Sequence, residues 1–130
     1  MSESLEAEGY QVRRSAYKLE TTFLIGYTHG SGGRVVAFNA EYDGLRGIGH
    51  GCGHNPIATS AIAAFLSTCE TLKHRCIKGH GFTVHLLGTP SEEGGGGEIH
   101  MIKKGAYKDV FACLVLHPMS PPPGMTGSSV

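Results

Sequence analysis

Residues 34–74, RVVAFNAEYDGLRGIGHGCGHNPIATSAIAAFLSTCETLKH, decide the fold. Residues 34–42 are a predicted strand, which follows a short turn and a first strand at residues 21–28 that is rich in β-branched and aromatic side chains. After the glycine-rich loop 44–54, Asn55-Pro56 favours a helix start, with asparagine as the cap and proline at the first helical position. Residues 57–74 are the predicted helix. Its front half is apolar nearly all round, so we expect it to be buried.

The sequence on both sides extends this strand and helix into an α/β pattern. Downstream, strands are predicted at residues 82–88 and 110–117, with a short helix at about 98–104 between them. Residues 110–117 are almost continuously apolar, as expected for a strand covered on both faces. Upstream, the turn between a strand at 21–28 and residues 34–42 is too short for a crossover helix, which predicts a hairpin.

These elements predict an α/β domain with a mixed, mostly parallel sheet flanked by helices. We expect the domain to occupy residues 1–118, and residues 119–130 to be a Pro/Gly/Ser-rich tail. A length of 130 residues allows one domain of ordinary size.

Composition excludes several classes of protein. The chain is 40% hydrophobic and 17% charged, which argues against disorder. Eleven basic and eleven acidic residues cancel, so we expect neither a nucleic-acid partner nor a membrane-surface partner. No apolar run approaches a membrane span and the first residues lack the pattern of a signal peptide, so a cytoplasmic protein is expected. The four cysteines have no paired spacing, which favours reduced thiols.

Polar groups with metal-binding potential follow three of the predicted strands. Asp43 precedes the loop that carries Cys52 and His54, Glu92-Glu93 follows residues 82–88, and His117 ends the last strand. Ligand sites in such sheets form at the carboxyl ends of the strands, so parallel neighbours would bring these groups to one edge.

Each group also has a plain structural interpretation. Cys52 and His54, two residues apart around Gly53, can turn onto one metal, or they can be a loop cysteine beside a surface histidine. Glu92-Glu93 can divide metal binding and proton transfer between two carboxylates, or it can be a solvated acidic turn. The four glycines that follow favour the first interpretation, because they let the backbone pass close to a ligand.

His117 can be a core or edge histidine, and Asp43 can begin a turn. Other motifs are excluded. The glycine-rich stretches match neither a dinucleotide fingerprint nor a phosphate-binding P-loop, and the chain has no Gly-x-Ser-x-Gly nucleophile elbow. A zinc ribbon would need a second closely spaced cysteine pair.

Three ordered motifs resemble a known family. Residues 41–55, 88–97 and 116–118 are similar to the signatures of metallopeptidase family twenty. The similarity is to its amidohydrolase branch, and especially to its dipeptidase and p-aminobenzoyl-glutamate hydrolase members. The resemblance implies a partial zinc-exopeptidase-like catalytic domain.

The resemblance also implies roles for individual residues. Cys52, His54, Glu93 and His117 match metal ligands, Glu92 matches the general base, and Asp43 matches a catalytic aspartate that orients a ligand or the base. Zinc is the expected ion, with manganese or cobalt as alternatives. The implied reaction is hydrolysis of an amide bond in a dipeptide or an N-acyl amino acid.

Members of the family are several times longer than this chain. They continue into a lid domain and supply a last histidine ligand, both of which this sequence lacks. We therefore expect a family fragment with a partial metal site and weak or absent activity. The alternative is a non-catalytic metal-binding or interaction module that forms a homo-oligomer or pairs with a longer homologue.

Overall fold

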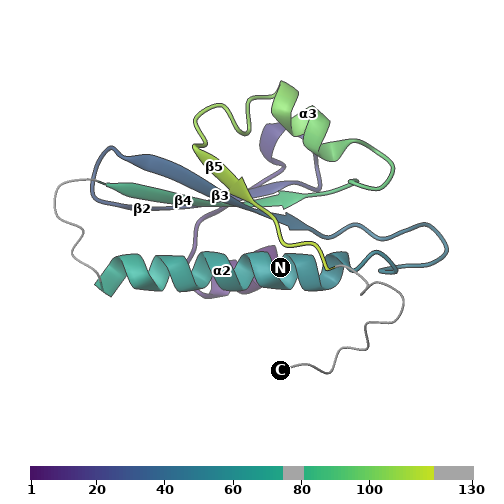
Figure 1. The fold of residues 1–130 in the computed structure, drawn as a ribbon, viewed down its shortest axis with the longest axis horizontal. Coiled ribbons are helices and arrows are strands. Elements are labelled where there is room, and N and C mark those ends of the chain that lie inside the picture. The colour runs from purple at the N-terminus through teal and green to yellow at the C-terminus, as the bar shows by residue number, and fades with distance from the viewer. Residues whose placement is uncertain (75–80, 119–130) are drawn as a thin grey trace, which may run out of the picture.

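The computed structural model describes residues 1–74 and 81–118, and these form one sheet with helices on both faces (Figure 1). In chain order the elements are α1 (Ser2–Ala7), β1 (Val12–Arg14), a short 3-10 helix η1 (Ala16–Lys18), β2 (Phe23–His29), β3 (Arg34–Glu41), α2 (His54–His74), β4 (Phe82–Thr89), α3 (Gly97–Lys103) and β5 (Ala112–Leu114). The predicted tail, residues 119–130, lies outside the described residues.

The sheet is five-stranded, in the order β1-β2-β4-β3-β5. β4 and β5 both run parallel to β3, whereas β1 and β4 both run antiparallel to β2. The connections that contain α2 and α3 join the three mutually parallel strands, because parallel neighbours need a crossover. The predicted α/β class with a mixed sheet flanked by helices is confirmed.

The predicted hairpin between residues 21–28 and 34–42 is wrong, because β4 lies between β2 and β3. The turn that joins β2 to β3 passes beside the beginning of β4, where the N–H of Gly81 donates to the carbonyl of Ser31 at 3.0 Å. A Cβ atom on Gly33 would lie 1.7 Å from the carbonyl oxygen of Gly81, and the φ angle of Gly33 is +90°. Glycine at this position therefore allows the two backbones to meet.

The two main helices cover opposite faces of the sheet (Figure 1). Phe65 of α2 packs with Ile25 of β2 and Leu86 of β4 in one core. On the other face, Met101 of α3 packs with Leu87 of β4. Leu86 and Leu87 are adjacent and both fully buried, since successive side chains of a strand point to opposite faces.

Only one face of α2 is buried, so the predicted burial of its front half on all sides is wrong. The buried positions recur every three or four residues: His54, Ile57, Ala58, Ala61, Phe65, Cys69 and Leu72. Ala63 lies on the exposed face, where a small side chain makes the sequence look apolar without being buried. No helix within residues 1–74 or 81–118 combines the length and apolar character needed to cross a bilayer.

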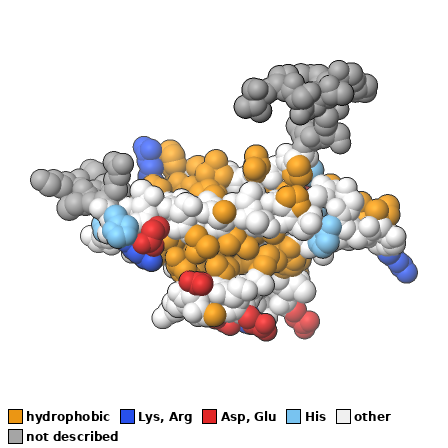
Figure 2. All heavy atoms as spheres, turned by 90° about the horizontal axis from the view of Figure 1, so that it is seen from below, with side chains coloured by type: hydrophobic (Ala, Val, Ile, Leu, Met, Phe, Trp, Pro, Cys, Tyr) orange, Lys and Arg blue, Asp and Glu red, His pale blue; other side chains and the backbone are white. Residues whose placement is uncertain are grey.

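β5 is shorter and more exposed than residues 110–117 predict. It pairs with β3 alone among the described strands and therefore forms an edge of the described sheet. Leu114, Val115 and Leu116 are 51%, 53% and 68% exposed, so the expectation of a strand covered on both faces is wrong. Figure 2 looks onto the α2 side of the molecule, and hydrophobic side chains gather on this face alongside the helix.

Candidate metal centre

The fold brings all six predicted site residues to one edge of the sheet, beyond the carboxyl ends of the parallel strands. They are Asp43 after β3, Cys52 and His54 at the beginning of α2, Glu92 and Glu93 after β4, and His117 after β5. The structure thus places these side chains together, and the metal-binding and catalytic roles assigned to them stay predictions.

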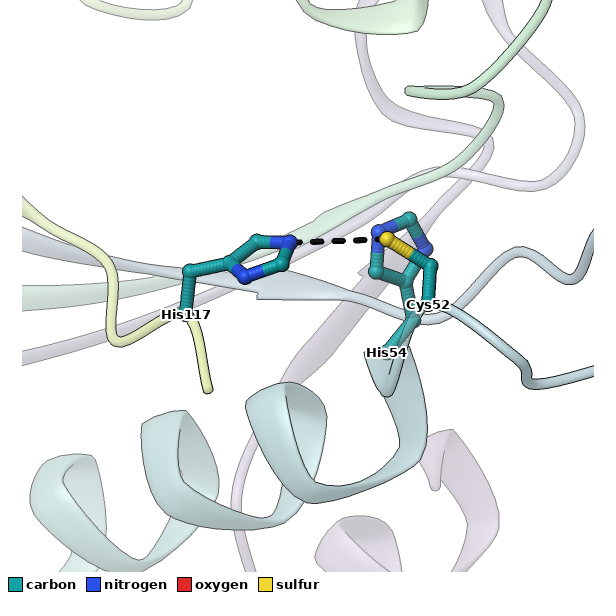
Figure 3. Close-up of side chains that lie close together, drawn as sticks. All are labelled: Cys52, His54 and His117. Carbon is teal, nitrogen blue, oxygen red and sulfur yellow. Dashed lines mark hydrogen bonds between the residues drawn. The ribbon is translucent and has the colours of Figure 1, made fainter. Parts of the chain in front are cut away.

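Two overlapping groups of possible metal ligands share His54. The ligand atoms of Cys52, His54 and His117 all lie within 4.8 Å of one another, and so do those of His54, Glu92 and Glu93. Figure 3 shows the first group, in which Cys52 Sγ lies 3.5 Å from His117 Nε2 beside the His54 ring.

α2 begins earlier than expected, and this places His54 in its first turn. The N–H of Ile57 donates to the carbonyl of Gly53 at 3.2 Å, so Gly53 takes the place predicted for an Asn55 cap. The φ angle of Gly53 is +86°, a backbone conformation that residues other than glycine rarely adopt. This turn directs His54 inward, and its side chain is 0% exposed.

The hydrogen bonds of His54 define which of its ring nitrogens is free. Nδ1 lies 2.9 Å from the main-chain carbonyl oxygen of Asp43, and because a carbonyl only accepts, Nδ1 carries the hydrogen. In the neutral ring, Nε2 then holds a lone pair, and this buried nitrogen has no hydrogen-bond partner among residues 1–74 and 81–118. It faces Glu92 Oε2 at 3.8 Å and Glu93 Oε1 at 3.9 Å. A histidine lone pair that faces two carboxylates is suited to binding a metal ion together with them.

Asp43 connects the two loops of the site. Its Oδ1 lies 3.1 Å from His54 Nδ1, and its Oδ2 accepts a hydrogen bond from the main-chain N–H of Glu93 at 3.2 Å. Burial acts to raise the pKa of Asp43, but the N–H groups of Glu93 and Glu92 outweigh it and lower the pKa overall. An ionised Asp43 therefore holds the loop after β4 against the histidine at the start of α2.

Cys52 lies in a strongly negative environment. The neighbouring Glu93 carboxylate, followed by burial and the charge of Glu92, raises the pKa of its thiol to about 11. His117 Nδ1 lies 2.8 Å from the carbonyl oxygen of Pro118 and so carries a hydrogen, which leaves Nε2 facing the thiol. The sulfur becomes a thiolate at neutral pH only when a cation is bound beside it.

Two further carboxyls border the site, and sequence reasoning assigned neither of them a role. Glu41 is 7% exposed, and burial and the neighbouring Glu98 raise its pKa. Burial is also the main reason that the pKa of Glu98 is raised. The sequence could have indicated that Glu41 lies near the site, because it is two residues before Asp43 and residues at that spacing share a face of a strand. Nothing in the sequence indicated Glu98, because only the fold of the glycine-rich loop between β4 and α3 brings this residue to the border of the site.

The side chains fit a divalent transition metal. A thiol, imidazoles and carboxylates are the ligands that zinc takes in proteins. Within the described residues, the only ion-pair partner of Glu41, Asp43, Glu92 and Glu93 is His54. Partly buried carboxylates without a lysine or arginine leave negative charge for a cation to balance.

Comparison with known proteins identifies the family. Residues 33–129 match the sequence profile of Peptidase family M20/M25/M40. The match covers most of the chain, so the chain belongs to this family, as the three motifs predicted.

Curated relatives of this chain include a hydrolase subunit and two dipeptidases, all much longer than the chain. One subunit of the p-aminobenzoyl-glutamate hydrolase of Escherichia coli (strain K12) is 34% identical over 135 residues, which cover 91% of this chain and 27% of the relative. The Xaa-Arg dipeptidases of Mus musculus and Homo sapiens are each 42% identical over 83 residues, which cover 64% of this chain and 19% of the relative. The chain thus spans about a fifth to a quarter of the length of these proteins.

A solved structure has the same fold. The YXEP protein of Bacillus subtilis, described as a dinuclear metal binding peptidase from the M20 family, superposes with a TM-score of 0.63. The similarity covers 84% of this chain and 33% of that protein, at 22% sequence identity. It confirms the expected partial catalytic-domain fold.

Proposed function

We propose that residues 1–118 form the metal-binding part of an amidohydrolase or dipeptidase catalytic domain. One observation carries the proposal: the buried Nε2 of His54, which has no hydrogen-bond partner in the described residues, faces the carboxylates of Glu92 and Glu93. The names of the relatives, p-aminobenzoyl-glutamate hydrolase and Xaa-Arg dipeptidase, support a dipeptide or an N-acyl amino acid as the substrate class.

In this proposal Cys52, His54, Glu93 and His117 hold the metal, and the soft sulfur and imidazole ligands favour zinc over manganese or cobalt. A divalent metal at this site supplies a Lewis acid for the amide carbonyl and makes water more acidic.

The remaining chemistry belongs to two carboxylates of the chain. Glu92 is the general base, and its carboxylate is 45% exposed, which leaves it open to water and substrate. It takes a proton from the attacking water and passes it to the leaving amine. Asp43 fixes the orientation of His54 through its main-chain carbonyl and that of Glu93 through its side chain.

We expect this chain by itself to bind metal and to turn over little substrate. Glu92 and Glu93 are 45% and 28% exposed within the described residues. Efficient hydrolysis requires a positioned substrate and a site from which bulk water is excluded.

Elemental analysis of the purified chain tests the proposed metal site. We expect at least about one equivalent of zinc in the wild type and its loss in the Cys52→Ser/His54→Ala double variant. The matched control is Cys113→Ser/His74→Ala, because Cys113 donates to Asn39 and His74 pairs with Glu70, away from the site. A folded wild type without metal would contradict the proposed site. Chelator-sensitive dipeptide hydrolysis would support the hydrolase and overturn the expected weak activity.

The alternative function is a non-catalytic module that pairs with a longer homologue. The exposed Leu114, Val115 and Leu116 beside the edge strand β5 favour it, because exposed apolar side chains beside an open edge are suited to pairing with another chain. Co-purification with a longer relative, abolished by Leu116→Asp, would support this alternative. A monodisperse monomer that ignores the relative would contradict it.

A further inference from the structure

Glu41, the last residue of β3, has an unusual environment for a carboxylate. It is 7% exposed, and its Oε2 lies 3.8 Å from Nε2 of His54. Within the described residues, no lysine or arginine lies within ion-pairing distance of it. Burial of a carboxylate is costly unless a cation or hydrogen-bond donors compensate for it.

The group that Glu41 faces cannot compensate for this charge. His54 already donates its Nδ1 hydrogen to the carbonyl of Asp43, so Nε2 presents a lone pair in the neutral ring. Nε2 is itself buried, and no group in the part of the chain that the structure describes forms a hydrogen bond with it. A cation between the buried Nε2 and the nearly buried carboxylate of Glu41 would compensate for both.

The separation of the two atoms suits a shared ion. Zinc binds histidine nitrogen at about 2.0–2.1 Å and carboxylate oxygen at about 2.0–2.2 Å, so a nitrogen and an oxygen bound to one ion lie no more than about 4.3 Å apart. The 3.8 Å between Glu41 Oε2 and His54 Nε2 equals the separation between His54 Nε2 and Glu92 Oε2. Its distance to His54 therefore allows Glu41 to share an ion with the histidine, whereas Glu92 and Glu93 also lie within 4.8 Å of each other and of His54 as a group of three.

We propose that Glu41 is a further ligand of the metal centre, sharing a divalent ion with His54. This inference rests on the proposed function and adds a residue to which the resemblance assigns no role. β3 holds Glu41 in parallel register with Thr89 of β4, so its backbone is fixed by the sheet and not by a loop. A ligand on a strand is already in position before the metal arrives.

The competing explanation is a neutral carboxyl that donates a hydrogen bond to His54 Nε2. Glu41→Gln separates the two, because glutamine keeps a donor and loses the anionic ligand. Glu98→Gln is the matched control. It removes a neighbouring carboxyl whose charge acts on Glu41 but which lies outside ion-pairing distance of His54.

The experiment measures zinc affinity by chelator competition and the visible absorption spectrum of the cobalt(II)-loaded chain, for the wild type and both variants. We expect Glu41→Gln to lose at least about tenfold in zinc affinity and to change the cobalt spectrum. Glu98→Gln should keep the wild-type spectrum and nearly wild-type affinity.

The outcomes separate this inference from the proposed function. A wild type that binds neither metal contradicts the proposed function itself. A wild type that binds metal, with Glu41→Gln equal to it in affinity and spectrum, overturns the role of Glu41 and leaves the metal centre standing. If Glu41→Gln does not fold, Glu41→Asp replaces it. A carboxylate one methylene shorter must weaken binding and alter the spectrum, and unchanged behaviour overturns the inference.

Discussion

Zinc binding by this chain should release a proton from Cys52. The pKa of the Cys52 thiol is raised to about 11 by the Glu93 carboxylate, burial and the charge of Glu92. At about pH 7.5, roughly one molecule in three thousand then carries a thiolate before metal binds. Because zinc binds the thiolate, it must displace the proton.

The sign and size of the pH dependence follow from that pKa. Below it, the thiolate fraction falls about tenfold for each pH unit, so zinc affinity should rise about tenfold per unit between about pH 7.5 and 9. Isothermal titration calorimetry in buffers of different ionisation enthalpy counts the released protons directly. We expect the release per zinc to fall by about one proton in Cys52→Ser.

Cys113→Ser is the control for this experiment, because Cys113 donates to Asn39 Oδ1 at 3.2 Å and takes no part in the cluster. It should release as many protons as the wild type. Zinc binding with no proton release and no pH dependence would refute the assignment of Cys52 as a ligand with a raised pKa.

Three other predictions test the packing and the support of the site. Gly88→Ala should lower the free energy of unfolding by about 1–3 kcal/mol, because its Cβ would lie 2.1 Å from a ring carbon of Phe23. Gly94→Ala, whose Cβ would meet nothing within 4 Å, is the matched control, and equal urea midpoints would contradict the packing. Phe65→Ala should lower the same free energy by about 3–5 kcal/mol because the ring is fully buried, and a loss below about 1 kcal/mol would be inconsistent with that burial. Asp43→Ala should weaken zinc binding by about 10–100-fold in chelator competition, and unchanged affinity would show that Asp43 does not support the ligands.

Sequence reasoning succeeded where a local pattern has one structural solution. The strand at 82–88 and the short helix near 98–104 are present as β4 and α3. The carboxyl ends of parallel strands meet at one edge, so the gathering of Asp43, Glu93 and His117 followed from topology alone.

Prediction from the sequence failed where the pairing of two strands depends on a third strand from elsewhere in the chain. Two strands joined by a short turn favour a hairpin, and nothing local to residues 21–42 indicates that β4 enters between them. The glycines at 33 and 81 make that close passage possible, but glycine alone also suits an ordinary turn.

The site residues show the same division. The spacing made Cys52 and His54 candidate ligands and the family resemblance favoured them, but the tautomer of His54 depends on a carbonyl that only the folded loop brings near. Glu41 lies in the predicted strand on the same face as Asp43, but only the fold shows that its carboxylate faces the buried ring of His54.

Zinc K-edge X-ray absorption of the zinc-loaded chain tests the central claim most directly, because it identifies the atoms bound to the metal. We predict one sulfur at about 2.3 Å together with nitrogen and oxygen ligands at about 2.0–2.2 Å. The sulfur contribution should disappear in Cys52→Ser and persist in Cys113→Ser. A wild-type spectrum with no sulfur, or a sulfur contribution that survives Cys52→Ser, would contradict a metal centre built on Cys52 and His54.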